Sequence, residues 1–412
     1  MLAVLCGAWT APALAASGGG VALGTGTSAA PSRAAPGGGN PLSGRAMWIW
    51  ELPSANGGNV SSIIATAHRY GIGTLMIKSS DGTDRWSQFT SALVSELHAG
   101  GVKVCAWQYV YGDHPVTEAY NGAAAVHDGA DCLLIDAESE YEGKYVSAQT
   151  YIARLRGLIG ARYPVALAGF PYVDYHPAFP YSVFLGPGGA QYDAPQMYWR
   201  DIGVTTDSVF AHTYSYNLVY GRPIFPLGQV YGNPPARQVV RFRELSRAYG
   251  AAGLSWWDWQ ETRPSAWTAL SRPAGALSGY VPDKVMASIG DGAQGDMVVW
   301  AQEHLITAGY PIAISGDFGY HTLLEVQAFQ SAHGLGVDGI VGPATWAALL
   351  AYRPATVTWT APGRGPNQAT VATAAVLHPG AAPIVSVIPR SASRPATRDE
   401  IAGAGGAGRP PR

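Results

Sequence analysis

The sequence predicts an α/β protein, in which an eightfold strand–helix barrel precedes a small all-α domain. Over residues 45–273, short apolar or aromatic runs alternate with helical stretches eight times. That number of units in about 230 residues is typical of a (β/α)8 TIM barrel. A different pattern, with helical periodicity and two Gly-containing loops, covers residues 296–352 and predicts a three-helix module.

The barrel strands are predicted from their apolar runs. These are residues 46–52, 73–79, 102–110, 131–138, 164–172, 194–200, 222–230 and 253–259. Helices fill the gaps, for instance 60–71, 87–100, 146–163 and 235–250, and several of them end at Gly, a common helix stop. A doubly wound open sheet is the alternative, but no Gly-rich phosphate loop follows the first strand.

The other segments have biased compositions. Residues 1–16 form an apolar stretch ending in Ala13-Leu14-Ala15, which has the pattern of a cleaved export signal; an uncleaved anchor is the alternative. Residues 17–44 and 274–295 are expected to be linkers, and residues 353–412 a disordered tail. No other run reaches the ~20 apolar residues of a membrane span. We therefore expect a protein secreted to the cell wall, without stable membrane insertion after export.

Composition limits the partners. A net charge of −2 over 412 residues leaves no basic field for nucleic acid. The 13 Trp and 22 Tyr residues suit a neutral ligand with flat apolar faces, such as a sugar, although each ring can equally be core. Histidines are scattered and cysteines are few, so we expect no metal and no cofactor. We also expect a monomer, with free buried thiols at Cys105 and Cys132 rather than a disulfide.

The candidate catalytic residues follow the fourth strand, which reads LLIDAE. Alternation along a strand places Leu134, Asp136 and Glu138 on one face, directed into the barrel mouth, where active sites of such barrels lie. Two carboxyls in close proximity raise at least one pKa, as a general acid requires. The alternative is that the pair caps the next helix or pairs with basic neighbours. Glu140 and Glu142 lie beyond the strand and are expected to form a solvated face or the acidic start of the next helix.

Other strand ends contribute polar groups and rings that suit a polysaccharide cleft. We expect substrate contacts from Glu51, Trp50, Lys78, Gln108, Gln196, Tyr198, Trp199, Gln229, Trp257, Asp258 and Trp259. Lys78 has a competing interpretation, because an ion pair with Glu138 would keep that carboxyl ionised.

Two family resemblances extend this reading. The segments WAQEHLITAGYPI, SGDFGYHT, FQSAHGL and VDGIVGPATW within residues 296–350 resemble the bacterial peptidoglycan-binding domain, with a shortened first loop. The resemblance implies docking on peptidoglycan, with Asp317, Tyr320 and Asp338 as candidate contacts.

The Asp-x-Glu ending the fourth strand is similar to that of family 25 muramidases and, more distantly, of family 18 chitinase-like proteins. This resemblance implies that Glu138 is the catalytic acid and that Asp136 positions the acetamido group of the substrate. Two departures stand out: Glu51 lies near the place of the muramidase strand-one Asp, and Leu134 stands where the chitinase pattern has an Asp.

The sequence therefore predicts an exported glycosidase that hydrolyses β-1,4 bonds of peptidoglycan glycan strands and is held on the wall by its C-terminal domain. The alternative is a wall-binding protein with a degenerate, non-catalytic barrel, which the departure at Glu51 favours.

Overall fold

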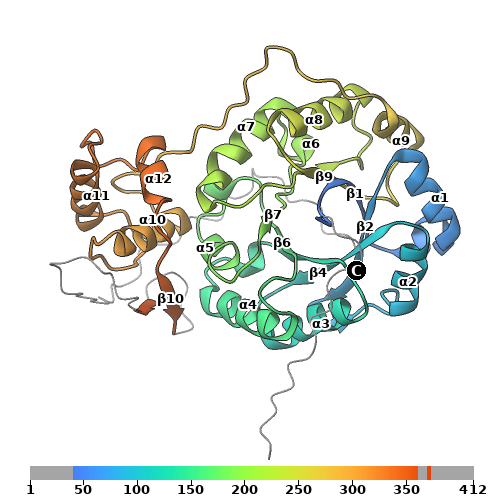
Figure 1. The fold of residues 1–412 in the computed structure, drawn as a ribbon, viewed down its shortest axis with the longest axis horizontal. Helices are drawn as coiled ribbons and strands as arrows, with labels where there is room; N and C mark the ends of the chain where they lie inside the picture. The colour runs from blue at the N-terminus through green and yellow to red at the C-terminus, as the bar shows by residue number, and fades with distance from the viewer. Residues whose placement is uncertain (1–39, 361–368, 373–412) are drawn as a thin grey trace, which may run out of the picture. The chain divides into compact units, whose positions relative to one another are not determined.

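The computed structural model describes residues 40–360 and 369–372 of the chain (Figure 1). The predicted export signal, most of the first linker and most of the predicted tail lie outside the described residues. Within the described part, no helix is both long and apolar enough to span a membrane.

The predicted barrel is present, and its strands are parallel neighbours. They are β1 (Gly44–Ile49), β2 (Thr74–Asp81), β4 (Lys103–Val110), β5 (Cys132–Ala137), β6 (Val165–Ala168), β7 (Tyr192–Asp193), β8 (Leu227–Gln229) and β9 (Gly253–Trp257). The order along the sheet is β7-β6-β5-β4-β2-β1-β9-β8. Parallel bridges Asp193↔Ile224 and Gln196↔Leu227 join the two ends of this order, so the sheet closes on itself. A short strand, β3 (Asp84–Arg85), pairs antiparallel with the end of β2.

Helices surround the strands in the described chain (Figure 1). They are α1 (Val60–Tyr70), α2 (Ser91–Ala99), α3 (Pro115–His127), α4 (Tyr145–Ile159), α5 (Tyr181–Phe184), α6 (Trp199–Ile202), α7 (Thr206–Asn217), α8 (Ala236–Ala248) and α9 (Pro264–Ser271). Side-chain caps start α1, α2 and α7, where Asn59, Thr90 and Thr205 each accept a backbone N–H of the first turn. Gly71, at φ 65°, ends α1 in the left-handed conformation that glycine adopts freely.

Short 3₁₀ segments shape the loops between these elements. They are η1 (Leu52–Ser54), η2 (Asn56–Gly58), η3 (Ser139–Tyr141), η4 (Val173–Tyr175) and η5 (Leu218–Tyr220). The first three follow the carboxyl ends of β1 and β5, where a barrel of this type carries its site.

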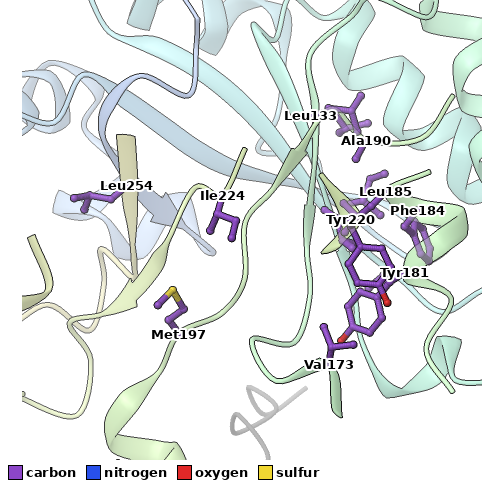
Figure 2. Packing of buried hydrophobic residues seen from close by; sticks show 14 of the residues in the cluster. Leu133, Val173, Tyr181, Phe184, Leu185, Ala190, Met197, Tyr220, Ile224 and Leu254 are labelled. Carbon is purple, nitrogen blue, oxygen red and sulfur yellow. The ribbon is translucent and has the colours of Figure 1, made fainter. Parts of the chain in front are cut away.

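Two apolar cores follow from the alternation of side chains along the strands. An inner core fills the barrel and includes Trp48, Met76, Trp107 and Leu134. An outer core packs between strands and helices, and it receives the alternate strand residues such as Leu133. Figure 2 shows part of the outer core, where rings from α5 and η5 lie close together beside apolar residues of the strands. Leu134 therefore faces inward, as the sequence predicts.

The prediction of free thiols at Cys105 and Cys132 is wrong. They are register partners on the neighbouring strands β4 and β5 and are fully buried in the inner core. Their sulfur atoms form a disulfide rather than the expected free thiols. Both side chains point into the barrel from directly paired positions, which brings the two sulfurs together.

The C-terminal module contains the three predicted helices, α10 (Asp296–Thr307), α11 (Tyr320–Ala332) and α12 (Pro343–Leu349). Its two similar loops are held by two glutamines in the same way. The Gln302 side chain accepts the backbone N–H groups of Ser315 and Gly316, and the Gln330 side chain accepts that of Gly339. Each amide also donates to its loop. The two loops therefore have the same construction, in which a glutamine side chain forms hydrogen bonds with the loop backbone.

Strand β10 (Thr356–Trp359) lies where the sequence predicts a tail without structure. It pairs antiparallel with β11 (Ala369–Ala372). The Gln149 side chain of α4 accepts from the Trp359 N–H and donates to the Val357 carbonyl. Because Val357 and Trp359 are also buried, the start of the predicted tail is ordered.

Asp296, the first residue of α10, connects the module to the barrel. Its fully buried carboxylate accepts hydrogen bonds from the Tyr145 and Tyr220 hydroxyls, both at 2.9 Å, and from the backbone N–H and hydroxyl of Ser182, both at 2.7 Å. Trp300 adds a buried hydrogen bond from its indole N–H to the Val219 carbonyl. Burial of the carboxylate raises the pKa of Asp296 to about 6, although all four bonds favour its ionised form.

Candidate active site

The centre of the site is an acid pair, Asp136 and Glu138, at the carboxyl end of β5. Asp136 is buried and Glu138 is partly exposed. The Gln196 side-chain nitrogen donates to Asp136 Oδ1 at 3.0 Å and to Glu138 Oε1 at 2.9 Å. One amide from the β7–β8 side of the barrel therefore fixes both carboxyls in the mouth.

The surroundings of this pair favour its protonated forms. The pKa of Asp136 lies well above its ordinary range, because of burial first and the neighbouring Glu138 carboxyl second; Lys78 acts in the opposite direction. Burial also raises the pKa of Glu138, partly offset by the hydrogen bond from Gln196. Two acids that share one site cannot both ionise freely, so the pair holds a proton more tightly than isolated carboxyls would.

Lys78 does not form the ion pair with Glu138 that the sequence left open. Its ammonium pairs with Asp81 at 2.7 Å rather than with Glu138. It is almost fully buried, with ring centroids of Trp86 at 4.4 Å and of Trp107 at 4.8 Å. The Trp50 ring lies farther away, at 6.0 Å. Lys78 and Trp50 therefore belong to the mouth, and the charge of Lys78 acts on Asp136 through space.

Tyr109 is a site residue that the sequence analysis missed. It is paired in register with Asp136, and its hydroxyl donates to Glu140 Oε2 at 2.8 Å. Burial and the neighbouring Glu138 carboxyl raise its pKa above the ordinary value. Its position two residues after the inward-facing Trp107 was a usable signal, because alternation directs both side chains into the barrel.

Three of the residues predicted to contact sugar have side chains that face the outer core rather than the barrel mouth. Gln108 is fully buried and donates to the Tyr151 hydroxyl at 2.7 Å. The Trp199 ring packs on Phe242 with centroids 5.2 Å apart, and Trp259 packs on Trp267 at 4.9 Å. Gln108 directly follows an inward-facing Trp107, so strand alternation turns it to the helices.

Two further predicted contacts, Glu51 and Gln229, form hydrogen bonds within the protein. Glu51 is exposed, and its carboxylate accepts from the Ser54 hydroxyl within the η1 turn. Gln229 is fully buried, and its side-chain oxygen accepts the backbone N–H of Arg200 at 2.8 Å.

The remaining predicted barrel residues do lie around the mouth. Trp257 packs against Trp48 and Trp107, with centroids 5.7 and 5.4 Å apart. Tyr198 is buried, and its pKa is raised well above the ordinary value by burial and by nearby acidic groups that include Asp136. Asp258 is fully buried, and its burial raises its pKa to about 7.

The three candidate contacts of the module differ in their surroundings. Tyr320 is 68% exposed at the start of α11, and Asp317 is exposed in the preceding loop. Asp338 is also exposed, but its carboxylate accepts the Ile340 N–H and the Gln330 amide, which lower its pKa. Asp338 therefore shapes its own loop, whereas Tyr320 presents a free ring face to solvent.

Within the described residues, no group of three or more His, Cys, Asp or Glu side chains is arranged to hold a metal ion.

Comparison with known proteins identifies the C-terminal module. Residues 294–349 match the family described as "Putative peptidoglycan binding domain". A zinc D-Ala-D-Ala carboxypeptidase of Streptomyces albus G is 41% identical over 88 residues, which are 20% of this chain and 33% of that protein. An uncharacterized protein in the bpoA1 3′ region of Kitasatospora aureofaciens is 35% identical over 82 residues, 20% of this chain and 70% of its own length. The C-terminal module is therefore a peptidoglycan-binding domain and belongs to that family. The chain spans about a third of the carboxypeptidase's length.

Two solved structures are similar to different shares of this chain. A peptidoglycan-binding protein from Clostridioides difficile shares 43% identity, over 15% of this chain and 40% of that one, with a TM-score of 0.15. A class V chitinase from Pseudomonas fluorescens aligns over 55% of this chain and 98% of its own, at 9% identity and a TM-score of 0.45. At such values the second likeness carries no argument about activity, which must come from the site itself.

Proposed function

We propose that this protein is a glycosidase of the bacterial cell wall, which hydrolyses β-1,4 bonds of peptidoglycan glycan strands while its C-terminal domain holds it on the wall. The observation that carries the proposal is the acid pair of Asp136 and Glu138, bridged by one Gln196 amide at the barrel mouth. Tethering by the C-terminal domain raises the local concentration of substrate without adding contacts at the reacting bond.

In this proposal Glu138 is the general acid. Glycoside hydrolysis needs a protonated carboxyl beside the leaving oxygen, and burial raises the pKa of Glu138 in the required direction. The partial exposure of Glu138 leaves it within reach of a sugar, whereas Asp136 lies deeper.

Asp136 is assigned a positioning role. Both carboxyls project from one strand, so Asp136 does not lie across a sugar ring from Glu138, as a second carboxylate of an ordinary pair would. Substrate-assisted glycosidases instead use the acetamido group of the sugar itself. Asp136 would orient that group, and Trp257 and Tyr198 lie close enough to the mouth to bound the sugar.

Export is supported by the disulfide. A fully buried bond between Cys105 and Cys132 is typical of proteins that fold in an oxidising compartment. We propose that the protein acts outside the cytoplasm, at the cell wall.

The experiment is the release of reducing ends from purified cell walls by the wild-type chain and by Glu138→Gln. The substitution keeps the shape of the side chain but replaces its carboxyl by an amide that cannot act as a general acid, so we expect loss of nearly all activity with wall binding unchanged. Equal activity of the two proteins would remove Glu138 from its proposed role.

A second candidate is a wall-binding protein whose barrel does not catalyse. It is favoured by Glu51, which stands near the place of the muramidase strand-one Asp and whose exposed carboxylate accepts a hydrogen bond from the Ser54 hydroxyl. Retention of the wild-type chain on insoluble peptidoglycan without any release of fragments would support this candidate.

A further inference from the structure

A pocket next to η1 and η2 has no assigned role. It has a volume of about 610 Å³ and lies between η1, η2 and the segment that follows β3. Leu52, Pro53, Arg85, Trp86 and Gln88 line it together with two glycines. We call it the rim pocket, because η1 and β3 follow the carboxyl ends of β1 and β2, the same rim of the barrel that carries Glu138.

The rim pocket is held in shape by Gln88. The side-chain oxygen of Gln88 accepts the Leu52 N–H at 2.8 Å, and its nitrogen donates to the carbonyls of Trp50 at 2.8 Å and Lys78 at 3.0 Å. One amide thus ties η1, the end of β1 and the end of β2 together. The backbone N–H of Trp86 also donates to the Ser79 carbonyl at 2.9 Å. The walls are therefore fixed before any ligand arrives.

The chemistry of the rim pocket suits a sugar with an acidic substituent. The partly exposed Trp86 ring lies beside Leu52 and Pro53, and such a flat apolar surface can take the C–H face of a sugar. The Arg85 side chain is 52% exposed and pairs with Asp128 at 2.8 Å. A guanidinium has five donors, so one exposed ion pair leaves capacity for a carboxylate of a ligand.

A short chain of contacts links the rim pocket to the acid pair. The ammonium of Lys78 lies 4.4 Å from the Trp86 ring centroid and 4.8 Å from that of Trp107. The same ammonium lowers the pKa of Asp136. Strands β2, β4 and β5 are consecutive neighbours, so about 10 Å separates the end of β2, which Trp86 contacts through Ser79, from the acid pair on β5.

We propose that the rim pocket is a binding subsite for a peptidoglycan strand, remote from the bond at Glu138. One N-acetylated sugar stacks on Trp86, and a carboxylate of its stem peptide binds Arg85. This inference deepens the proposed function and rests on it for the identity of the ligand.

The test measures binding of two soluble glycans to the full chain carrying Glu138→Gln, which prevents turnover. One is a peptidoglycan tetrasaccharide with its acidic stem peptides, and the other is the uncharged tetrasaccharide of N-acetylglucosamine. We expect Trp86→Ala to weaken binding of both glycans about three- to tenfold, because both lose the same stacking surface. Trp86→Phe keeps a ring and should retain most of the affinity. Binding by the C-terminal domain is the same background in every variant, so the loss is read as the difference above that background.

Arg85 has a matched control in its partner. Arg85→Gln should weaken only the acidic glycan, about two- to fivefold, because an exposed charge pair is modest in strength. Asp128→Asn breaks the same ion pair but keeps the guanidinium, so binding of the acidic glycan should be unchanged or tighter.

Three results would overturn the inference: wild-type affinity in Trp86→Ala, an equal loss for both glycans in Arg85→Gln, or no binding of either glycan by the parent chain. Release of reducing ends by the chain with intact Glu138 is measured in parallel. Binding that depends on Trp86 without any hydrolysis would contradict the proposed function and leave the rim pocket as a glycan subsite.

Discussion

The disulfide inside the barrel permits a quantitative prediction about stability. Cys105 and Cys132 are 27 residues apart in the sequence, and a cross-link that closes a loop of this length stabilises the fold by about 3.5 kcal/mol in the chain-entropy model. For a domain of this size, loss of the disulfide should therefore lower the Tm by about 7–14 °C. Both sulfurs are fully buried, so reduction should require unfolding.

The assay is chemical unfolding of the oxidised chain, of Cys105→Ala, of Cys132→Ala and of the double variant. If the bond exists, each single substitution already removes it, so each should cost nearly as much as the double. Thiol titration in denaturant should find neither of these cysteines free in the wild type. Costs of the two single substitutions that add up to the cost of the double, together with two reactive thiols, would refute the disulfide.

Three further predictions concern groups that the structure places at critical positions. Gln196→Ala should lower wall hydrolysis at least tenfold with little change in wall binding, because both carboxyls lose their shared donor; unchanged kcat would contradict this. Burial raises the pKa of Asp193 to about 8, so the folded chain binds this proton more tightly, and its stability should fall as pH rises from about 4 to 8. Asp193→Asn should flatten that slope in pH-dependent urea unfolding, and an unchanged slope would refute the assignment. Asp296→Ala should destabilise the chain by about 3 kcal/mol, because it leaves buried donors of Tyr145, Ser182 and Tyr220 without an acceptor; a loss under 1 kcal/mol in the same assay would contradict this.

Much of the barrel could be predicted from the sequence, because its strands read as apolar runs between helices. Strand β7 was harder to predict, because it has only two residues and the barrel closes there through isolated bridges. Alternation placed Leu134 and the acid pair correctly because LLIDAE is a regular strand. The same rule, applied from the inward-facing Trp107, would have rejected Gln108 and found Tyr109.

The surroundings of Lys78, the disulfide and strand β10 could not be predicted, because they depend on contacts that sequence patterns do not encode. Sequence patterns alone did not show that the rings of Trp50, Trp86 and Trp107 surround Lys78, or that its ammonium pairs with Asp81, three residues further on, rather than with Glu138. The disulfide required the register of β4 against β5, which places Cys105 opposite Cys132. The tail prediction failed at β10 because Gln149, far away in the sequence, supplies its hydrogen bonds.

The central claim is that Glu138 donates a proton to a glycosidic oxygen of peptidoglycan. It is tested most directly by mass spectrometry of borohydride-reduced fragments from purified walls treated with the wild-type chain or with Glu138→Gln. The account predicts muropeptides with newly formed reducing sugar ends in the wild-type digest and their absence in the variant digest. The same fragments in both digests, or no fragments from the wild type, would contradict it.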